Sequence, residues 1–256
     1  MVKNPRAHAY EKIHCMTSSA RTVSLLIPCF IDQFFPRVGD AVLQILARLG
    51  VPCQYPEEQT CCGQFALTAG DMGTARRLAR HFLRVFAGEG DIICPSASCT
   101  LTVRRDYPLL AGSPTTSRQI HHVTSRVFEL SEWLAARGPL PWRPQFKGIL
   151  ALHHSCKARE LKVLSNAAAL LEQVEGLTVT TISPYYTCCG FGGVFAAQHP
   201  DLARAIGEAY LEAVVATGAT GLISLDVSCF LHLRGVAKSM GLTLEFYHLA
   251  EILLGE

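Results

Sequence analysis

Thr60-Cys61-Cys62-Gly63 occurs again, 127 residues further along the chain, as Thr187-Cys188-Cys189-Gly190. In both halves a further cysteine precedes the pair, with 31 residues between them: Cys29 in the first half and Cys156 in the second. A fourth cysteine follows the pair, Cys99 after 36 residues in the first half and Cys229 after 39 in the second. Two independent sets of structural cysteines would rarely match so closely. The pattern therefore indicates a tandem duplication.

Short apolar runs lie just before the outer cysteines in both halves. Residues 23–28 and 148–152 lead to the first cysteine of each half, and residues 91–94 and 221–225 lead to the last. Runs of this length are typical of buried strands. A glycine follows each cysteine pair, which fits a tight turn that brings the backbone close to a bound group.

Segments with helical periodicity separate these runs. Apolar residues recur at helical spacing over residues 71–88, over 42–49 before Gly50, and over 201–217 before Gly218. Strands that alternate with helices predict an α/β fold of two tandem, pseudo-symmetric Rossmann-like repeats with parallel strands. Ligands of such sheets bind in loops at the carboxyl ends of the strands, which is where the cysteines fall.

The predicted organisation has four parts: an N-terminal leader over residues 1–22, a first repeat over 23–137, a linker over 138–147 and a second repeat over 148–256. The linker is assigned from its Pro-rich composition. A polar segment over 112–122 is expected to be a mobile loop.

Composition narrows the class of protein. The chain has 256 residues, of which 49% are hydrophobic and 17% charged, as in compact globular proteins. A net charge of +2 without a basic stripe argues against a nucleic-acid binder. No apolar stretch approaches the roughly 20 residues of a membrane helix, and the polar N-terminal segment lacks the apolar core of a secretory signal. We therefore expect a cytoplasmic protein without a membrane span.

The cysteine content points to metal or redox chemistry. The chain contains eleven cysteines, and an odd number in a reducing compartment argues against a disulfide framework. Thiolate sulfur is the soft ligand that iron–sulfur clusters and zinc select. The candidate metal ligands are the eight repeated cysteines: Cys29, Cys61, Cys62, Cys99, Cys156, Cys188, Cys189 and Cys229. The alternative is that they are inert, buried side chains, but packing alone does not demand a duplicated pattern.

Three cysteines have no counterpart in the opposite half. Cys15, in the leader, and Cys53, near a strand start, are interpreted as structural. Cys94 ends a predicted strand where the second half has Ser224, and it is either a fifth ligand or a buried strand-end residue. His153 precedes Cys156, and it either donates a hydrogen bond toward a cluster sulfur or is an ordinary core histidine.

These motifs resemble those of the CCG-domain (cysteine-rich domain) iron–sulfur proteins, in particular the A-subunit type of bacterial lactate-utilisation complexes. The iron–sulfur subunit of glycolate oxidase and the B-type subunit of heterodisulfide reductase are wider relatives. The resemblance runs from about Val23 to Glu251 and is carried by six stretches: Cys29-Phe-Ile-Asp-Gln-Phe-Phe-Pro-Arg-Val-Gly39, Tyr55-Pro-Glu-Glu-Gln-Thr-Cys-Cys-Gly-Gln64, Pro95-Ser-Ala-Ser-Cys99, Thr187-Cys-Cys-Gly-Phe-Gly-Gly193, Asp226-Val-Ser-Cys229 and His248-Leu-Ala-Glu-Ile252.

The resemblance implies that each set of four cysteines ligates a [4Fe–4S]-type cluster. It also implies that the chain works in an L-lactate dehydrogenase-type oxidoreductase complex that forms pyruvate. The partners would be other subunits, including a ferredoxin-like iron–sulfur subunit, and an electron acceptor. The chain has neither a Gly-x-Gly-x-x-Gly fingerprint nor a convincing acid–base pair, so the lactate chemistry is expected to need those partners.

One departure from the wider family bears on the cluster type. The heterodisulfide reductase pattern ends each copy with Cys-x-x-Cys, and here its first position is Ser96 in one copy and Asp226 in the other. Four thiolates per copy favour an ordinary cubane cluster and leave room for zinc in one site. Ser96 and Asp226, together with Cys94 and His153, are expected to surround the ligands.

Three hypotheses of function follow from the sequence. The first is an electron relay with two iron–sulfur clusters. The second is a zinc-binding scaffold subunit without redox activity. The third is a thiol–disulfide oxidoreductase, which expects a Cys-x-x-Cys motif that is absent and leaves Cys29 and Cys156 unexplained.

Overall fold

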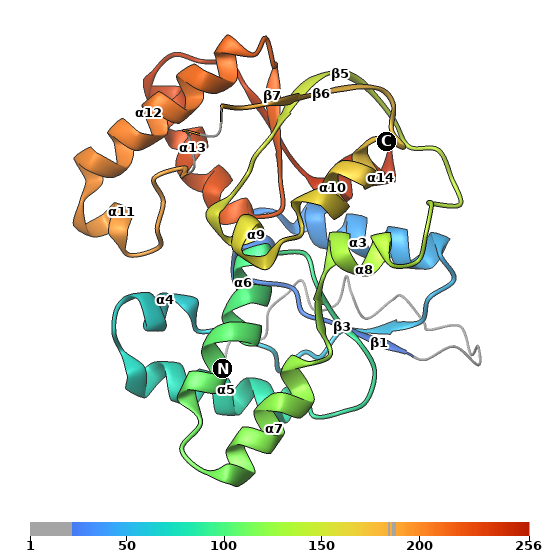
Figure 1. Ribbon diagram of the computed structural model, residues 1–256, viewed down its shortest axis with the longest axis vertical. Helices are drawn as coiled ribbons and strands as arrows, with labels where there is room; N and C mark the ends of the chain where they lie inside the picture. The colour runs from blue at the N-terminus through green and yellow to red at the C-terminus, as the bar shows by residue number, and fades with distance from the viewer. Residues whose placement is uncertain (1–21, 184, 186–187, 256) are drawn as a thin grey trace.

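Two four-stranded parallel sheets, one in each half of the chain, make up the framework of the molecule (Figure 1). The computed structural model describes residues 22–183, 185 and 188–255. The first sheet consists of β1 (Val23–Leu25), β2 (Cys53–Gln54), β3 (Ile92–Cys94) and β4 (Val127–Glu129); the second consists of β5 (Gln145–Leu152), β6 (Glu175–Thr181), β7 (Gly221–Ser224) and β8 (Glu245–His248). The predicted fold class, two tandem α/β repeats with parallel strands, is confirmed.

The two sheets have the same strand order. The spatial order of the strands is β2-β1-β3-β4 in the first sheet and β6-β5-β7-β8 in the second. In each sheet, the strand that comes second in the chain lies at the edge, and the strand that comes first lies in the interior. Every residue of β1, β3 and β7 is buried. Interior parallel strands are covered on both faces, which explains why their sequences are continuous apolar runs rather than alternating ones.

Helices connect the strands. In the first half these are α2 (Cys29–Phe34), α3 (Pro36–Arg48), α4 (Gln64–Thr68), α5 (Met72–Val85), α6 (Ala97–Leu101), a π-helical turn (Thr102–Asp106), a 3-10 turn (Tyr107–Leu110), α7 (Pro114–Thr124) and α8 (Leu130–Ala135). In the second half they are α9 (Cys156–Leu161), α10 (Leu164–Leu171), α11 (Phe195–Gln198), α12 (Pro200–Ala216), α13 (Val227–Ser239) and α14 (Leu249–Leu254).

The three helices predicted from apolar periodicity are confirmed as α3, α5 and α12. Asp71 caps α5 because its side chain accepts a hydrogen bond from the Thr74 N–H. Gly50, with φ +64°, follows α3 in a conformation that favours glycine.

The loop predicted over residues 112–122 is wrong. Most of this segment is α7. Ser113 accepts a hydrogen bond from the Thr116 N–H, and Pro114 occupies the first turn, so the helix has a strong start signal. Ile120 and Val123 are 2% exposed each, and their burial outweighs the polar character of the remaining residues.

The two halves interlock through reciprocal helix pairs. Helix α3 of the first half packs against α14 of the second, and α10 of the second packs against α8 of the first. Arg37 forms an ion pair with Glu251 at 2.6 Å, and Arg48 donates to the Leu254 carbonyl at 2.8 Å. A continuous apolar core extends through both halves.

A second pair of reciprocal contacts places the cysteines at the interface between the halves. Helix α2, which begins at Cys29, packs against α13, and α9, which begins at Cys156, packs against α6. Each candidate site is therefore flanked by a helix from the opposite half.

The predicted domain boundaries stay a prediction. Strand β5 begins at Gln145, inside the predicted linker, and Trp142 in that linker donates to the Leu253 carbonyl at 2.9 Å. The predicted leader, with Cys15, lies outside the described residues apart from Thr22. In the described part of the chain, every helix is too short or too polar to cross a bilayer.

Candidate metal centres

The four candidate ligands of the first half gather around one small cavity. Cys29 begins α2, and Cys61 and Cys62 lie in the loop between β2 and α4. Cys99 lies in α6, directly after β3. The sulfur atoms of Cys62 and Cys99 are 3.3 Å apart, and the Cys29 and Cys61 thiols are hydrogen-bonded. All four side chains line a cavity of about 20 Å³.

The second half repeats this arrangement around a wider cavity. Cys156 begins α9, and Cys229 lies in the first turn of α13. Cys188 and Cys189 lie between β6 and α11. The four cysteines line a cavity of about 290 Å³, with Cys156 and Cys188 exposed and the other two buried. The second site is thus larger and more open than the first.

The glycine after each cysteine pair shapes the turn in the same way. Gly63 has φ +85° and Gly190 has φ +90°, a region that residues with a Cβ rarely adopt. The N–H of each glycine donates to the sulfur two residues earlier, Cys61 or Cys188, at 3.3 Å. The turn therefore presents a backbone donor to one candidate ligand in each site.

Gly190 also has no room for a side chain, which gives a direct prediction. A Cβ there would lie 2.3 Å from the carbonyl oxygen of Ala203. Gly190→Ala should therefore lower the free energy of unfolding by about 3 kcal/mol, from backbone strain and overpacking together. Gly218→Ala is the matched control, because Gly218 has φ +76° with open space around it, and it should cost about 1 kcal/mol. Equal unfolding midpoints in urea for the two variants would contradict this account of the turn.

Hydrogen bonding among the thiols polarises the first site. The Cys29 and Cys62 thiols lower the pKa of Cys61 to about 3. The thiols of Cys62 and Cys94 likewise lower the pKa of Cys99. The hydrogen bonds from neighbouring thiols thus favour the deprotonated form of Cys61 and Cys99, which is the form that metal binding requires.

His153 lies next to the second site and has one nitrogen without a partner. Its Nδ1 is 2.5 Å from the Tyr210 hydroxyl, and no described residue bonds to its buried Nε2. The ligating atoms of His153, Cys189 and Cys229 lie within 4.8 Å of one another. Burial lowers the pKa of His153 to about 3, so the ring is neutral. A group bound at the cysteines would give this nitrogen the partner that it lacks.

Asp226 and Ser96 join the two halves between the sites. Both carboxylate oxygens of Asp226 accept hydrogen bonds. Oδ1 accepts from the Ser98 N–H at 2.8 Å and from the Ser96 hydroxyl at 3.1 Å. Oδ2 accepts from the Ser155 hydroxyl at 2.7 Å. Asp226 is 1% exposed, and burial raises its pKa. Where the wider family pattern has a cysteine, this chain has a hydrogen-bonded bridge across the interface.

Cys94 and Ser224, its counterpart in the second half, make equivalent contacts with the backbone. Its buried thiol contacts the Ser96 carbonyl at 3.6 Å, and the Ser224 hydroxyl contacts the Asp226 carbonyl at 3.5 Å. Both side chains thus hold the turn that follows a strand. Cys94 is also hydrogen-bonded to Cys99, one of the candidate ligands. Cys94 and the eight candidate ligands form no disulfide with one another.

Several residues around the sites have no obvious signal in the sequence. Gln64, Phe65, Ser98 and Ser228 line both cavities, so the two sites share a wall. The Phe65 ring stacks on Phe30 at 5.6 Å and meets Phe191 edge-on at 6.2 Å. Ser155 accepts a hydrogen bond from the Ala158 N–H as the N-cap of α9, a position that serine commonly occupies.

The donor set of each site is that of a thiolate-bound metal. In each site four cysteines from two helix starts and one loop converge, and at least two of them are buried; no other described feature explains a duplicated set of sulfurs. The residues therefore fit an iron–sulfur cluster or a zinc ion in each half.

Comparison with known families agrees with this geometry. The family described as "CCG: Cysteine-rich domain" matches residues 23–104 and 150–234, one copy in each half. The two matches contain all eight candidate ligands. The chain belongs to this cysteine-rich domain family, and it carries two copies of the domain.

Its similarity to individual members extends over almost the whole chain. It is 32% identical to "Lactate utilization protein A 2" of Bacillus cereus strain 03BB102, over 90% of this chain and 97% of that protein. It is 31% identical to "Lactate utilization protein A" of Bacillus cytotoxicus, over 90% of this chain and 98% of that protein. These proteins are therefore similar to this chain in both repeats.

A solved structure resembles the fold. The chain matches the crystal structure of a hypothetical protein from Helicobacter pylori with a TM-score of 0.52 and 12% sequence identity. The match covers 94% of this chain and 51% of that one. At this identity the likeness concerns the fold alone.

Proposed function

We propose that this chain is an iron–sulfur electron-transfer subunit of a complex that oxidises a 2-hydroxy acid, with L-lactate to pyruvate as the reaction. One observation carries the proposal: in both halves four cysteines, from two helix starts and one loop, converge on one cavity, and the two cavities share a wall. Four thiolates are the ligand set of [4Fe–4S] clusters. The proposal assigns one such cluster to each set of four cysteines.

A bound cluster would supply a one-electron redox centre, and the residues of the chain would set its potential. The N–H groups of Gly63 and Gly190 donate to ligand sulfurs, which draws electron density from the thiolate. In the second site, a ring nitrogen of His153 lies within 4.8 Å of the Cys189 and Cys229 sulfurs, and its Nε2 has no partner among the described residues. The two sites differ in these donors and in exposure, so we expect two different potentials.

The shared wall suits transfer between the sites. Ser98, Ser228 and Phe65 line both cavities. The Asp226 bridge holds the two halves at a fixed spacing, because it joins backbone and hydroxyl donors of one half to α9 of the other. A junction of buried, hydrogen-bonded side chains limits the reorganisation that accompanies a change of charge.

The substrate and partners are assigned by similarity. The relatives are named for lactate utilisation, and the sites described here contain no evident acid–base pair for removing the hydrogens of a 2-hydroxy acid. We assign that step to other subunits of the complex. A ferredoxin-like iron–sulfur subunit and an electron acceptor would exchange electrons with this chain in the cytoplasm, where free thiols persist.

The compactness of the first site favours a second candidate function for that site. Its cavity is about 20 Å³, against about 290 Å³ in the second, and two of its sulfurs are already 3.3 Å apart. Four closely spaced thiolates also form a complete structural zinc site. A zinc-binding scaffold without redox activity is therefore the alternative.

Visible spectroscopy separates these functions. The anaerobically purified chain should be coloured, and dithionite should bleach it. L-Lactate alone should leave the spectrum unchanged, because the oxidising step is assigned to partners. A colourless protein with no response to dithionite would support the zinc scaffold and contradict the electron-transfer role.

A further inference from the structure

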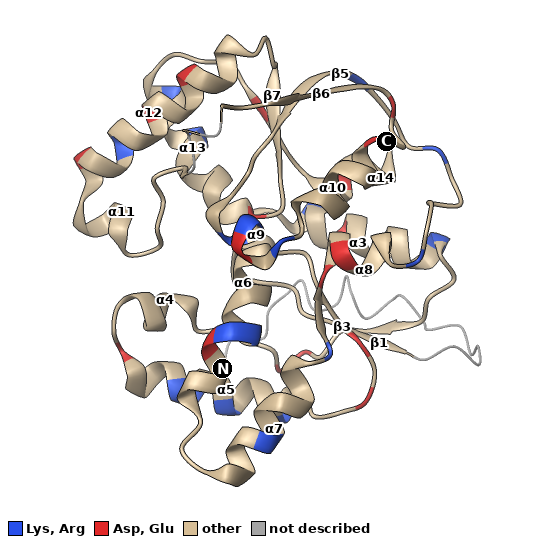
Figure 2. Cartoon of the chain, viewed as in Figure 1, with Lys and Arg blue, Asp and Glu red and all other residues tan. Residues whose placement is uncertain are grey.

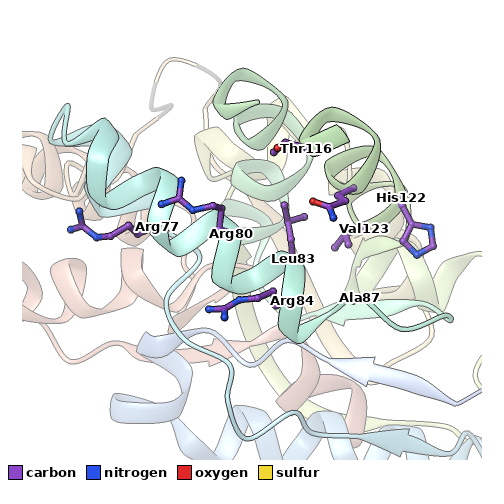
Figure 3. Close-up of a pocket in the computed structure, with 9 residues that line it drawn as sticks. Arg77, Arg80, Leu83, Arg84, Ala87, Thr116, His122 and Val123 are labelled. Carbon is purple, nitrogen blue, oxygen red and sulfur yellow. The ribbon is translucent and has the colours of Figure 1, made fainter. Parts of the chain in front are cut away.

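A basic groove lies between α5 and α7, away from the cysteines. It has a volume of about 770 Å³. Leu83 and Val123 form an apolar floor, while Arg77, Arg80 and Arg84 project from α5 along one side and His122 lies on the other (Figure 3). The groove thus combines an apolar base with a positively charged rim.

Of the three arginines that line this groove, Arg77 interacts with Asp71, whereas Arg80 and Arg84 have no acidic partner among the described residues. In the described part of the chain, no carboxylate oxygen lies within ion-pair distance of Arg80 or Arg84. Arg84 contacts the ring of His81 at 3.4 Å, and Arg77 donates to the Thr74 hydroxyl at 2.7 Å. Within the described residues, the charges of Arg80 and Arg84 are therefore not balanced by a carboxylate.

The corresponding helix of the second half shows that this charge is particular to α5. Helix α5 carries four arginines and no acidic residue, whereas α12 mixes both signs (Figure 2). On α12, Arg204 approaches Asp201 at 3.6 Å and Glu208 at 3.8 Å. The duplicated helix can thus fold with balanced charges.

The basic face of α5 also opposes helix stability. Arg76 and Arg84 each lie four residues from Arg80. Like charges at this spacing destabilise a helix by about 0.2–0.5 kcal/mol per pair. A helix that retains such repulsion beside an apolar groove is arranged for binding an oppositely charged group.

We propose that the groove between α5 and α7 docks an acidic, amphipathic segment of a partner protein. Apolar side chains of the segment would pack over the exposed Ala87 and the outer edge of Leu83, and its carboxylates would pair with Arg80 and Arg84. The guanidinium groups point in different directions along α5 rather than converging on one point (Figure 3). That arrangement suits carboxylates spread along a segment better than a single phosphate group.

A nucleic acid fits the groove less well. Among the described residues that line it there is no Phe, Tyr or Trp on which a base could stack. The exposed carboxylate of Glu89 lies 3.7 Å from His122, so the uncompensated positive charge of the groove is on its α5 side. The net charge of the chain is only +2.

The position of the groove connects it to the first site. Leu78 of α5 lies against Gly63 of the cysteine-pair turn, and His81 is 2.6 Å from the Glu58 carbonyl in the loop before that turn. A partner held on the outer face of α5 would therefore lie one helix away from the first set of cysteines. This link to electron transfer rests on the proposed function, whereas docking itself does not.

Peptide binding to the full chain tests the inference. The probes are a labelled acidic amphipathic peptide of Glu and Leu, its Lys and Leu counterpart, and a single-stranded RNA oligonucleotide, compared by fluorescence anisotropy. We expect the acidic peptide to bind most tightly and to weaken as salt rises. The double variant R80E/R84E should weaken it by about tenfold or more.

The control variant R143E/K238E makes the same change in net charge at two exposed positions away from the groove. It should leave binding of the acidic peptide unchanged. No binding of that peptide, equal losses in the two variants, or tighter binding of RNA would overturn the inference. Binding is measured with metal-free and metal-loaded protein, so a failure of the cluster assignment would be visible separately.

Discussion

Replacing Cys189 with serine is expected to empty the second site while the first site stays loaded. Cys189 is 5% exposed and contacts Cys229, so it lies at the inner end of the cavity, where solvent cannot replace a missing ligand. A serine hydroxyl is a much weaker ligand for iron or zinc than a thiolate. The metal content should fall by about half, since one of two four-thiolate sites is lost.

The reciprocal variant and a control make this result specific. Cys62→Ser, at the equivalent position of the first site, should also remove about half of the metal, and the double variant should remove nearly all of it. Cys53→Ser should keep the full content, because Cys53 lies in β2 and outside both cavities. Loss of metal from both sites in either single variant would show that the two sites do not load independently.

Replacing Asp226 with alanine is expected to cost about 3 kcal/mol of unfolding free energy. The change removes three hydrogen bonds and leaves the Ser98 N–H and two hydroxyls without their acceptor inside the interface. Buried donors that lose their partners account for most of such a cost. Because the bridge joins the two halves, metal content should decrease in both sites.

Asp201→Ala is the matched control for this prediction. The Asp201 side chain is 96% exposed, so its removal should change stability by no more than about 0.5 kcal/mol. Urea unfolding of the two variants gives the comparison. An Asp226→Ala protein with the unfolding midpoint of the control would mean that the carboxylate does not hold the interface.

The α/β architecture was predictable because both halves carry the same local features, an apolar strand sequence followed by a cysteine. The apolar runs before Cys29 and Cys156 include β1, which is buried throughout, and the buried carboxyl end of β5, and this burial favours apolar residues. The cysteines follow strand ends, and parallel strands bring their carboxyl ends to one edge. The gathering of four cysteines in each half follows from these two facts.

The contacts between the halves were not predictable from one sequence. Asp226 reaches Ser98 across 128 positions, and His153 meets Tyr210 across 57. Neither pair has a periodic or motif signal, because its geometry depends on how the two sheets pack. The sequence did place Ser96 and Asp226 beside the ligands, but only as positions where a cysteine is absent.

Helix α7 and the basic groove were missed by the sequence-based prediction for a different reason. The polar composition of residues 112–122 outweighed two buried apolar side chains in the sequence-based interpretation. Missing α7 also hid the groove, because α5 supplies only one of its walls. On sequence alone, the arginines of α5 are indistinguishable from an ordinary solvated helix face.

Metal and acid-labile sulfide analysis of the anaerobically purified chain tests the central claim most directly. Two [4Fe–4S] clusters predict iron and sulfide in equal amounts, roughly eight of each per chain. One zinc with about four irons would contradict the assignment of a cluster to the first site. Zinc without sulfide would contradict the electron-transfer role altogether.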